Sequence, residues 1–136
     1  MMKPFLHVAL GCVMLTMGAS ACQETQTPQD SLAGTTWVLY EFTPAGSPQA
    51  VLPTGQYTIS FHADGSYEVS LDVNMCGGNF QESGSSIEME SAACTEMCCD
   101  SEDALVWAGM LSDMVSFELT DDELTLSGQG SMVLIP

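Results

Sequence analysis

The sequence has 136 residues, enough for one domain of ordinary size once a leader is removed, and 46% of them are apolar. It contains one Lys or Arg against 18 Asp and Glu, which gives a formal net charge of −17. The single basic residue is Lys3, so loss of its +1 charge with the leader would change −17 to −18. Binding of nucleic acid, phosphate groups or anionic lipid depends on Lys and Arg, and the composition therefore excludes these functions.

Residues 1–21 have the pattern of a secretory signal peptide. Lys3 supplies the positive start, residues 5–17 are an apolar run, and residues 18–21 (Gly-Ala-Ser-Ala) are the small residues that a signal peptidase requires. The apolar run is too short for a transmembrane helix, which needs about 20 residues. We therefore predict an exported protein.

Cys22 follows the predicted cleavage site and has two interpretations. Ala-Ser-Ala-Cys resembles a lipobox, after which bacteria acylate the cysteine, whereas simple cleavage at the same bond would release a soluble secreted protein. Lipidation is favoured because an even number of cysteines follows Cys22, and because residues 23–31 are polar as in a flexible tether. With Gln23 in place of Asp after the cysteine, the chain resembles a lipoprotein sorted to the outer membrane of a Gram-negative cell, where it would face the periplasm or the surface. We thus predict residues 22–31 as the lipid-anchored tether.

Eight short stretches of apolar residues predict strands, and one longer stretch predicts a helix, in a domain over residues 32–136. The strands are expected within residues 32–42 and at 57–61, 67–73, 79–82, 86–89, 115–119, 124–126 and 132–135, and the helix from Asp100 or Ser101 to about Asp113. The turn at Asp64-Gly65 is the clearest hairpin signal. Strands, one helix and further strands predict an α+β domain with a curved, mainly antiparallel sheet.

The spacing of apolar residues also predicts which side chains face the core. In the first strand, the inner face is expected to include a residue near Glu41. In the helix, Leu105, Ala108 and Leu111 recur at helical spacing, which places Trp107 at the flank of the buried face.

The segment from Asp72 to Asp103 carries the densest chemical signal in the chain. It contains Cys76, Cys94, Cys98 and Cys99, which are all the cysteines that follow Cys22. Gly77 and Gly78 predict a bend or bulge where the backbone must pass closely.

The order of these signals resembles the META (HslJ-like) domain family. The matching residues are Gly34-Thr35-Thr36-Trp37, Asp64-Gly65, the segment around Asn74-Met75-Cys76-Gly77, Thr95-Glu96-Met97-Cys98 and Leu124-Thr125-Leu126. In this chain Gly77 stands where the family has Asn after the cysteine, and Cys94 and Cys99 are additional to the family's usual pair. The resemblance implies the fold and an envelope protein or lipoprotein, linked in some members to stress or drug tolerance. It brings no general set of catalytic residues.

Structural disulfides are the first interpretation of the cysteines, because export places them in an oxidising compartment. The resemblance implies a Cys76–Cys98 pair, which leaves Cys94 with Cys99, although the sequence alone allows three pairings. Closing a loop of about 20 residues would stabilise the fold by roughly 3 kcal/mol. We disfavour a Cys98–Cys99 bridge because such a small ring demands unusual geometry.

A metal or redox site is the alternative for the same four cysteines. Thiolates of Cys76, Cys94, Cys98 and Cys99 would suit Zn²⁺ or Cu⁺, and Met75, Met89 and Met97 would be soft ligands for copper. The spacing differs from a zinc ribbon, which needs two separated Cys-x-x-Cys pairs.

Catalytic motifs are not found in the sequence. His62 is the only histidine after the leader and is expected at the surface, and neither a nucleophile elbow nor a calcium-binding loop is present. We predict a non-enzymatic envelope lipoprotein without a cofactor, monomeric and attached to the membrane through Cys22, with a binding or envelope-stress role. The alternative is a metal-binding or redox-active envelope protein.

Overall fold

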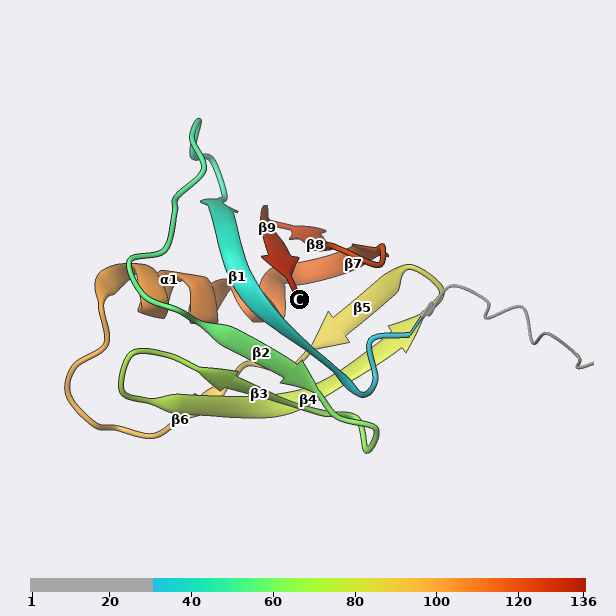
Figure 1. Ribbon diagram of the computed structural model, residues 1–136, viewed down its shortest axis with the longest axis horizontal. Helices are drawn as coiled ribbons and strands as arrows, with labels where there is room; N and C mark the ends of the chain where they lie inside the picture. The colour runs from blue at the N-terminus through green and yellow to red at the C-terminus, as the bar shows by residue number, and fades with distance from the viewer. Residues whose placement is uncertain (1–30) are drawn as a thin grey trace, which may run out of the picture.

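Nine strands and one α-helix follow one another along residues 31–136, which are the residues that the computed structural model describes (Figure 1). The predicted signal peptide and Cys22 lie outside these residues, as does nearly all of the predicted tether. The elements are β1 (Thr35–Pro44), β2 (Thr58–Phe61), β3 (Ser66–Ser70), β4 (Met75–Ser83), β5 (Ser86–Met89), β6 (Ala93–Cys94), α1 (Glu102–Met110), a 3-10 turn (Leu111–Asp113), β7 (Met114–Leu119), β8 (Leu124–Gly128) and β9 (Gly130–Ile135).

Eight of these strands form a closed antiparallel barrel. The hydrogen-bonded order is β3-β2-β1-β9-β8-β7-β5-β4, and β4 also pairs with β3, which completes the ring. The short strand β6 pairs with β4 outside this ring. The curved, mainly antiparallel sheet is thus confirmed, but it closes on itself, and the fold is mainly β with one short helix.

The long strand β1 makes this closure possible. Its first half pairs with β2 and its second half with β9, and the register shifts between Leu39 and Glu41. Such a bulge bends a strand and changes which face its side chains reach. After the bulge the buried residue is Phe42, which is 1% exposed, so the inner face continues at a residue near Glu41, as predicted.

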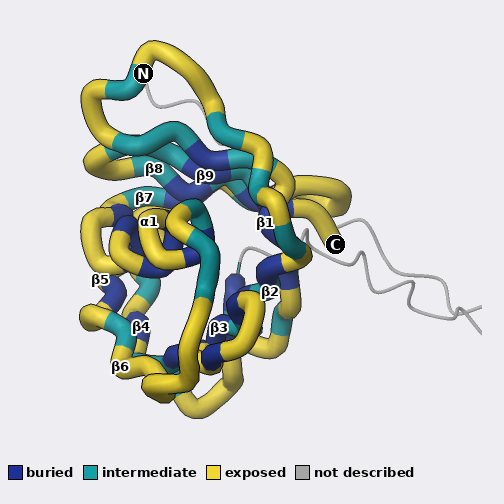
Figure 2. Tube along the Cα trace, turned by 90° about the vertical axis from the view of Figure 1, so that its left-hand side faces the viewer, coloured by how far each residue is buried: buried dark blue, intermediate teal, exposed yellow. Residues whose placement is uncertain are grey.

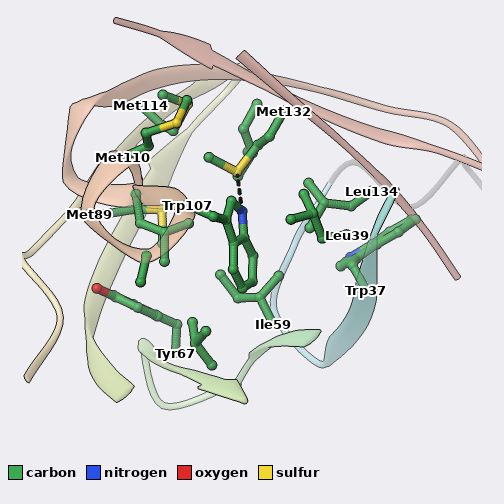
Figure 3. Packing of buried hydrophobic residues seen from close by; sticks show 14 of the residues in the cluster. Trp37, Leu39, Ile59, Tyr67, Met89, Trp107, Met110, Met114, Met132 and Leu134 are labelled. Carbon is green, nitrogen blue, oxygen red and sulfur yellow. Dashed lines mark hydrogen bonds between the residues drawn. The ribbon is translucent and has the colours of Figure 1, made fainter. Parts of the chain in front are cut away.

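Helix α1 lies across one end of the barrel (Figure 2). Its Trp107 side chain is buried in the barrel core. The Trp107 ring is fully buried and stacks on Tyr57 at 5.9 Å between ring centroids. Its Nε1–H donates to the sulfur of Met132 at 3.2 Å. Figure 3 shows the ring surrounded by methionine, leucine and isoleucine side chains, so the interior is a packed core.

The buried face of α1 differs from the predicted one. Trp107 is 0% exposed, whereas Leu105, predicted to face inward, is 56% exposed. Ala108 and Leu111 are buried as expected. No helix within residues 31–136 has the length and apolar character needed to span a membrane.

Strand β4 runs without a break through Gly77 and Gly78, where the sequence predicted a bend or bulge. The expected close approach is nevertheless present, because a Cβ on Gly78 would lie 2.9 Å from the Tyr67 ring. The Tyr67 hydroxyl donates to the carbonyl oxygen of Glu90 at 2.6 Å. Burial, with the nearby Glu90 charge, raises the pKa of Tyr67 to about 12, so this phenol stays protonated.

Candidate functional site

The segment between β5 and α1 carries three of the four cysteines and leaves the barrel wall. We call residues 93–101 the cysteine loop. Its first two residues form β6, in which Cys94 lies opposite Cys76 of β4 and Ala93 opposite Gly77. The loop then crosses the outside of the barrel and ends where α1 begins at Glu102.

The cysteines pair differently from the pairing that the family resemblance implied. Cys76 is joined to Cys94, with 4.0 Å between their Cα atoms. The expected Cys76–Cys98 and Cys94–Cys99 bridges are therefore wrong. The physical reason is strand β6, a two-residue pairing too short to be foreseen, which brings Cys94 opposite Cys76.

The four cysteines lie in different surroundings. Cys76 is 3% exposed in the core-facing row of β4, whereas Cys94, Cys98 and Cys99 are exposed. Within residues 31–136, no group of three or more His, Cys, Asp or Glu side chains is arranged to hold a metal ion.

The methionines suggested as copper ligands are divided between the two sides of the barrel wall. Met89 points into the core, where it is 4% exposed, while Met75 and Met97 are on the surface. A soft-metal site on this face would therefore draw on Met75 and Met97, without Met89.

Asn74 fixes the middle of the cysteine loop. It is the one buried polar residue found within the described part of the chain, at 7% exposed. Its Oδ1 accepts hydrogen bonds from the Thr95 hydroxyl at 2.8 Å and from the Met97 N–H at 2.7 Å. Its Nδ2 donates to the Met97 carbonyl at 2.6 Å and to a carboxylate oxygen of Asp100. One amide thus satisfies both backbone groups of Met97 and holds the loop on each side of Cys98-Cys99.

Asp100 anchors the end of the loop without a cationic partner. Its Oδ1 accepts from the backbone N–H of Val73 at 2.9 Å and of Asn74 at 3.2 Å. Desolvation alone would raise the pKa of Asp100, but these hydrogen bonds and the one from the Asn74 side chain outweigh it and lower the pKa. Uncharged N–H donors therefore stabilise the ionised carboxylate of Asp100, as a Lys or Arg side chain would in a protein that contains basic residues.

The start of α1 is held by a second carboxylate. Ser101 occupies the N-cap position, as one of the two predicted caps, but its hydroxyl makes no capping bond. It donates instead to Asp72 at 2.6 Å and lies 2.6 Å from the hydroxyl of Tyr57, which stacks on Trp107. A chain of contacts therefore links the cysteine loop to the centre of the barrel.

Asp103, in the first turn of α1, binds the preceding loop. Its carboxylate accepts from the Thr54 N–H at 2.7 Å and from the Thr54 hydroxyl at 3.0 Å. Desolvation raises the pKa of Asp103, but hydrogen bonds led by the Thr54 N–H lower it to about 2. Because the pKa is lower in the folded chain, the ionised form stabilises the fold above about pH 4, and this contribution is lost as the pH falls from about 4 to 2.

Replacing Asp103 with asparagine is expected to lower the free energy of unfolding at pH 7 by about 1 kcal/mol, after allowance for solvent screening. The loss should shrink between about pH 4 and 2, where the wild-type carboxylate also becomes neutral. Urea unfolding at several pH values measures both effects. Asp122→Asn, in the exposed turn between β7 and β8, is the control and should change stability by less than about 0.5 kcal/mol. An Asp103→Asn loss that stays constant down to pH 2 would contradict the assignment.

A shallow pocket of about 420 Å³ lies beside the Cys76–Cys94 bridge. His62, Glu68 and Met75 contribute to its walls. His62 is exposed, as predicted from its position before the Asp64-Gly65 turn. The pocket belongs to the same outer face as the cysteine loop, and this face therefore gathers most of the unusual chemistry of the domain.

The cysteines were predicted from the sequence, but the residues that position them were not. Asn74, Asp72 and Thr54 lie in loops or at strand ends, and only contacts between distant segments reveal their roles. The one available signal was an asparagine directly after the second hairpin strand and two residues before a cysteine.

Comparison with known proteins agrees with this fold. The META domain family matches residues 30–135. The chain is similar to a DUF4847 family protein from Bacteroides vulgatus, with a TM-score of 0.58 and 13% identity over 76% of this chain and 93% of that chain. It is also similar to a protein from Burkholderia xenovorans, with a TM-score of 0.59 and 15% identity over 76% of this chain and 82% of that chain. At these identities the likeness concerns the fold alone. No curated protein matches the sequence.

Proposed function

Since this chain belongs to the META domain family, we propose that it is a non-enzymatic lipoprotein of the bacterial cell envelope. Its barrel serves as a scaffold that presents the cysteine loop as a binding surface. The lipid anchor is Cys22, the membrane is the outer membrane, and the function concerns the integrity of the envelope under stress. The anchored protein is a monomer.

The observation that carries the proposal is the contrast between the filled interior and the surface of the loop. Trp107 occupies the centre of the barrel, so a ligand would bind outside it. On the outer face, Met97 is 65% exposed and Met75 is 47% exposed, although both are large and apolar. Asn74 meanwhile holds the Met97 backbone in place. A rigid backbone that displays exposed apolar side chains is typical of a binding loop on a scaffold.

The charge of the domain limits which partner would bind this face. Residues 31–136 contain no Lys or Arg, and Glu96, Asp100 and Glu102 lie in or next to the loop. A partner that combines apolar groups with positive charge would complement such a face. The proposed partner is therefore a component of the envelope that carries apolar groups and positive charge, and nucleic acid is excluded.

The proposal is tested by complementation of a strain that lacks the gene, grown under envelope stress. Met97→Ser removes an exposed apolar side chain of the loop, and Cys22→Ser removes the anchor. We expect both variants to fail to restore growth while the wild-type chain restores it. Val115→Ser is the matched control and should restore growth. Val115 is apolar and 63% exposed, as Met97 is exposed, but it lies on β7 and not in the cysteine loop.

Fractionation and intact-mass measurement of the same strains separate the parts of the proposal. Wild-type protein is expected in the outer membrane, with a lipid mass on a chain that begins at Cys22, and Cys22→Ser in the soluble fraction. An unmodified wild-type chain in the soluble fraction would show that the protein is secreted and is not a lipoprotein. Full restoration of growth by Met97→Ser would show that the loop is not the binding surface.

A further inference from the structure

A groove of about 280 Å³ separates α1 from the segment that leads from β5 into β6. We call it the helix groove. The helix side of the groove carries residues at the spacing of one helix face, and the facing side carries two residues from the end of the β5–β6 connection and from β6. These residues are Leu105, Ala108, Gly109 and Ser112 on the helix side, and Ala92 and Cys94 on the facing side.

The helix groove is open beside Gly109. A Cβ atom built on Gly109 has no other atom within 4 Å, whereas a Cβ on Gly78 would lie 2.9 Å from the Tyr67 ring. At the edge of the groove, Leu105 is 56% exposed although it is large and apolar. A side chain of another molecule can therefore enter beside Gly109 and cover Leu105 without displacing a residue of the barrel.

The backbone of Cys94 has hydrogen-bonding groups that β4 does not use. In the ladder between β4 and β6, Cys76 lies opposite Cys94, and the N–H of Thr95 donates to the carbonyl oxygen of Met75 at 2.9 Å. In an antiparallel pair, residues whose N–H and carbonyl face the neighbouring strand alternate with residues whose groups face away. Because the N–H of Thr95 faces β4, the N–H and carbonyl of Cys94 face away from it. An extended segment added beside β6 would satisfy both groups of Cys94.

The charge around the helix groove is entirely negative. Four exposed acidic residues lie within three residues of a groove residue in the sequence, namely Glu90, Glu96, Glu102 and Asp113. Residues 31–136 contain no Lys or Arg to offset them. An acidic segment is repelled by this rim, and a segment with Lys or Arg on either side of an apolar residue complements it.

We propose that the helix groove binds an extended basic segment of a partner protein. The segment runs along β6 and pairs its backbone with the N–H and carbonyl of Cys94. It places one apolar side chain in the groove, beside Gly109, and its Lys or Arg side chains face the acidic rim. This inference rests on the proposed binding role of the cysteine loop, because β6 is the beginning of that loop.

The binding is tested with a synthetic peptide, acetyl-Ser-Lys-Val-Leu-Val-Lys-Ser-amide, by isothermal titration calorimetry on the mature protein purified from its own cells. We expect saturable binding at low salt. Replacing both lysines with glutamate should weaken it at least about tenfold, and salt at about 1 M should remove most of this difference. Replacing the leucine with serine should weaken binding about tenfold, because the apolar contact in the groove is lost. N-methylation of the leucine removes the donor to the Cys94 carbonyl and should also weaken binding.

A variant of the protein tests the position of the site. Gly109→Leu fills the helix groove with a side chain of the chain itself, and should weaken binding of the lysine peptide at least about tenfold. The fold should be retained, as checked by circular dichroism, because the added Cβ meets no atom within 4 Å. Ala50→Leu is the matched control, since it adds an exposed leucine outside the groove and should leave the affinity unchanged.

Four results would overturn the proposal or one of its parts. The groove is overturned if the lysine peptide does not bind saturably, or if Gly109→Leu binds it as tightly as the wild-type protein. Equal affinities for the lysine and glutamate peptides would overturn the basic partner. An N-methylated peptide that binds with full affinity would overturn the pairing with Cys94.

Met97 is not part of the helix groove, so its variant separates this proposal from the proposed function. If Met97→Ser fails to restore growth while Gly109→Leu keeps full peptide affinity, the cysteine loop remains the binding surface and the groove is wrong. If Met97→Ser restores growth while Gly109→Leu loses the peptide, the groove remains and the exposed methionine surface is wrong.

Discussion

Replacing Trp107 with alanine is expected to lower the free energy of unfolding by about 3–5 kcal/mol, the range for loss of a large buried aromatic side chain. Trp107 is 0% exposed and is the main contact between α1 and the barrel interior. The variant would lose the stacking on Tyr57 and the hydrogen bond to the sulfur of Met132, and would leave a cavity between them. Urea unfolding followed by circular dichroism measures the change.

Two further variants separate the role of the ring from the role of the helix. Leu105→Ala, two residues earlier on the exposed side of α1, should change stability by less than about 0.5 kcal/mol. Trp107→Phe keeps much of the ring and should recover a large part of the loss. Similar losses for Trp107→Ala and Leu105→Ala would mean that the barrel does not depend on the ring at its centre.

Replacing Asn74 with alanine is expected to lower the free energy of unfolding by about 3 kcal/mol. The side chain of Asn74 makes four hydrogen bonds, to Thr95, Asp100 and both backbone groups of Met97. In the variant, Thr95, Asp100 and Met97 lose their hydrogen-bond partner. Leaving these polar groups unsatisfied costs more free energy than the four hydrogen bonds contribute on balance. Amide hydrogen exchange should show the largest loss of protection in the cysteine loop.

Asn79→Ala provides the matched control for this effect. Asn79 is on the same strand, β4, but is exposed and makes one side-chain hydrogen bond, to Glu90 at 3.0 Å. Its replacement should cost less than about 0.5 kcal/mol. If Asn74→Ala cost as little as Asn79→Ala, the loop would be held by the Cys76–Cys94 disulfide and not by the asparagine.

The local parts of the fold were readable from the sequence because they depend on neighbouring residues. The hairpin around Asp64-Gly65 joins β2 to β3, and Phe61 lies opposite Tyr67 as two-residue alternation requires. Barrel closure depends instead on pairings such as Leu39 with Leu134, which are far apart in the chain. Periodicity carries no information about such pairings, so the closed ring was predicted only as a curved sheet.

Side-chain direction departs from simple periodicity where the backbone departs from regular geometry and where apolar residues surround the helix. A register shift between Met114 and Ser116 leaves Val115 63% exposed, although simple alternation would bury it with Phe117. In α1, apolar residues such as Leu105 and Val106 stand on the outer side as well, so helical spacing alone did not identify the buried face. The contact of Trp107 with distant strands decides it.

The position of the candidate site in the chain could be predicted from the sequence, but the arrangement of its residues could not. The cysteine cluster and its position before the helix were recognisable, because residue type and spacing are local properties. The pairing of Cys76 with Cys94 follows from strand β6, which has two residues, and the role of Asn74 follows from its burial. Both depend on the folded barrel.

Barrel closure also affects how this protein behaves as a concentrated solution. Near the isoelectric point of the full sequence, at about pH 4.1, the net charge that keeps the molecules apart falls to zero. Many β proteins then associate through the unpaired edges of their sheets. In the described residues, the eight-stranded ring leaves little unpaired edge, since its one short pairing is that of Ser86 in β5 with Ser116 in β7, and β6, which pairs with β4 beside the ring, has two residues. The closed ring thus supplies the colloidal protection that the acidic surface no longer gives.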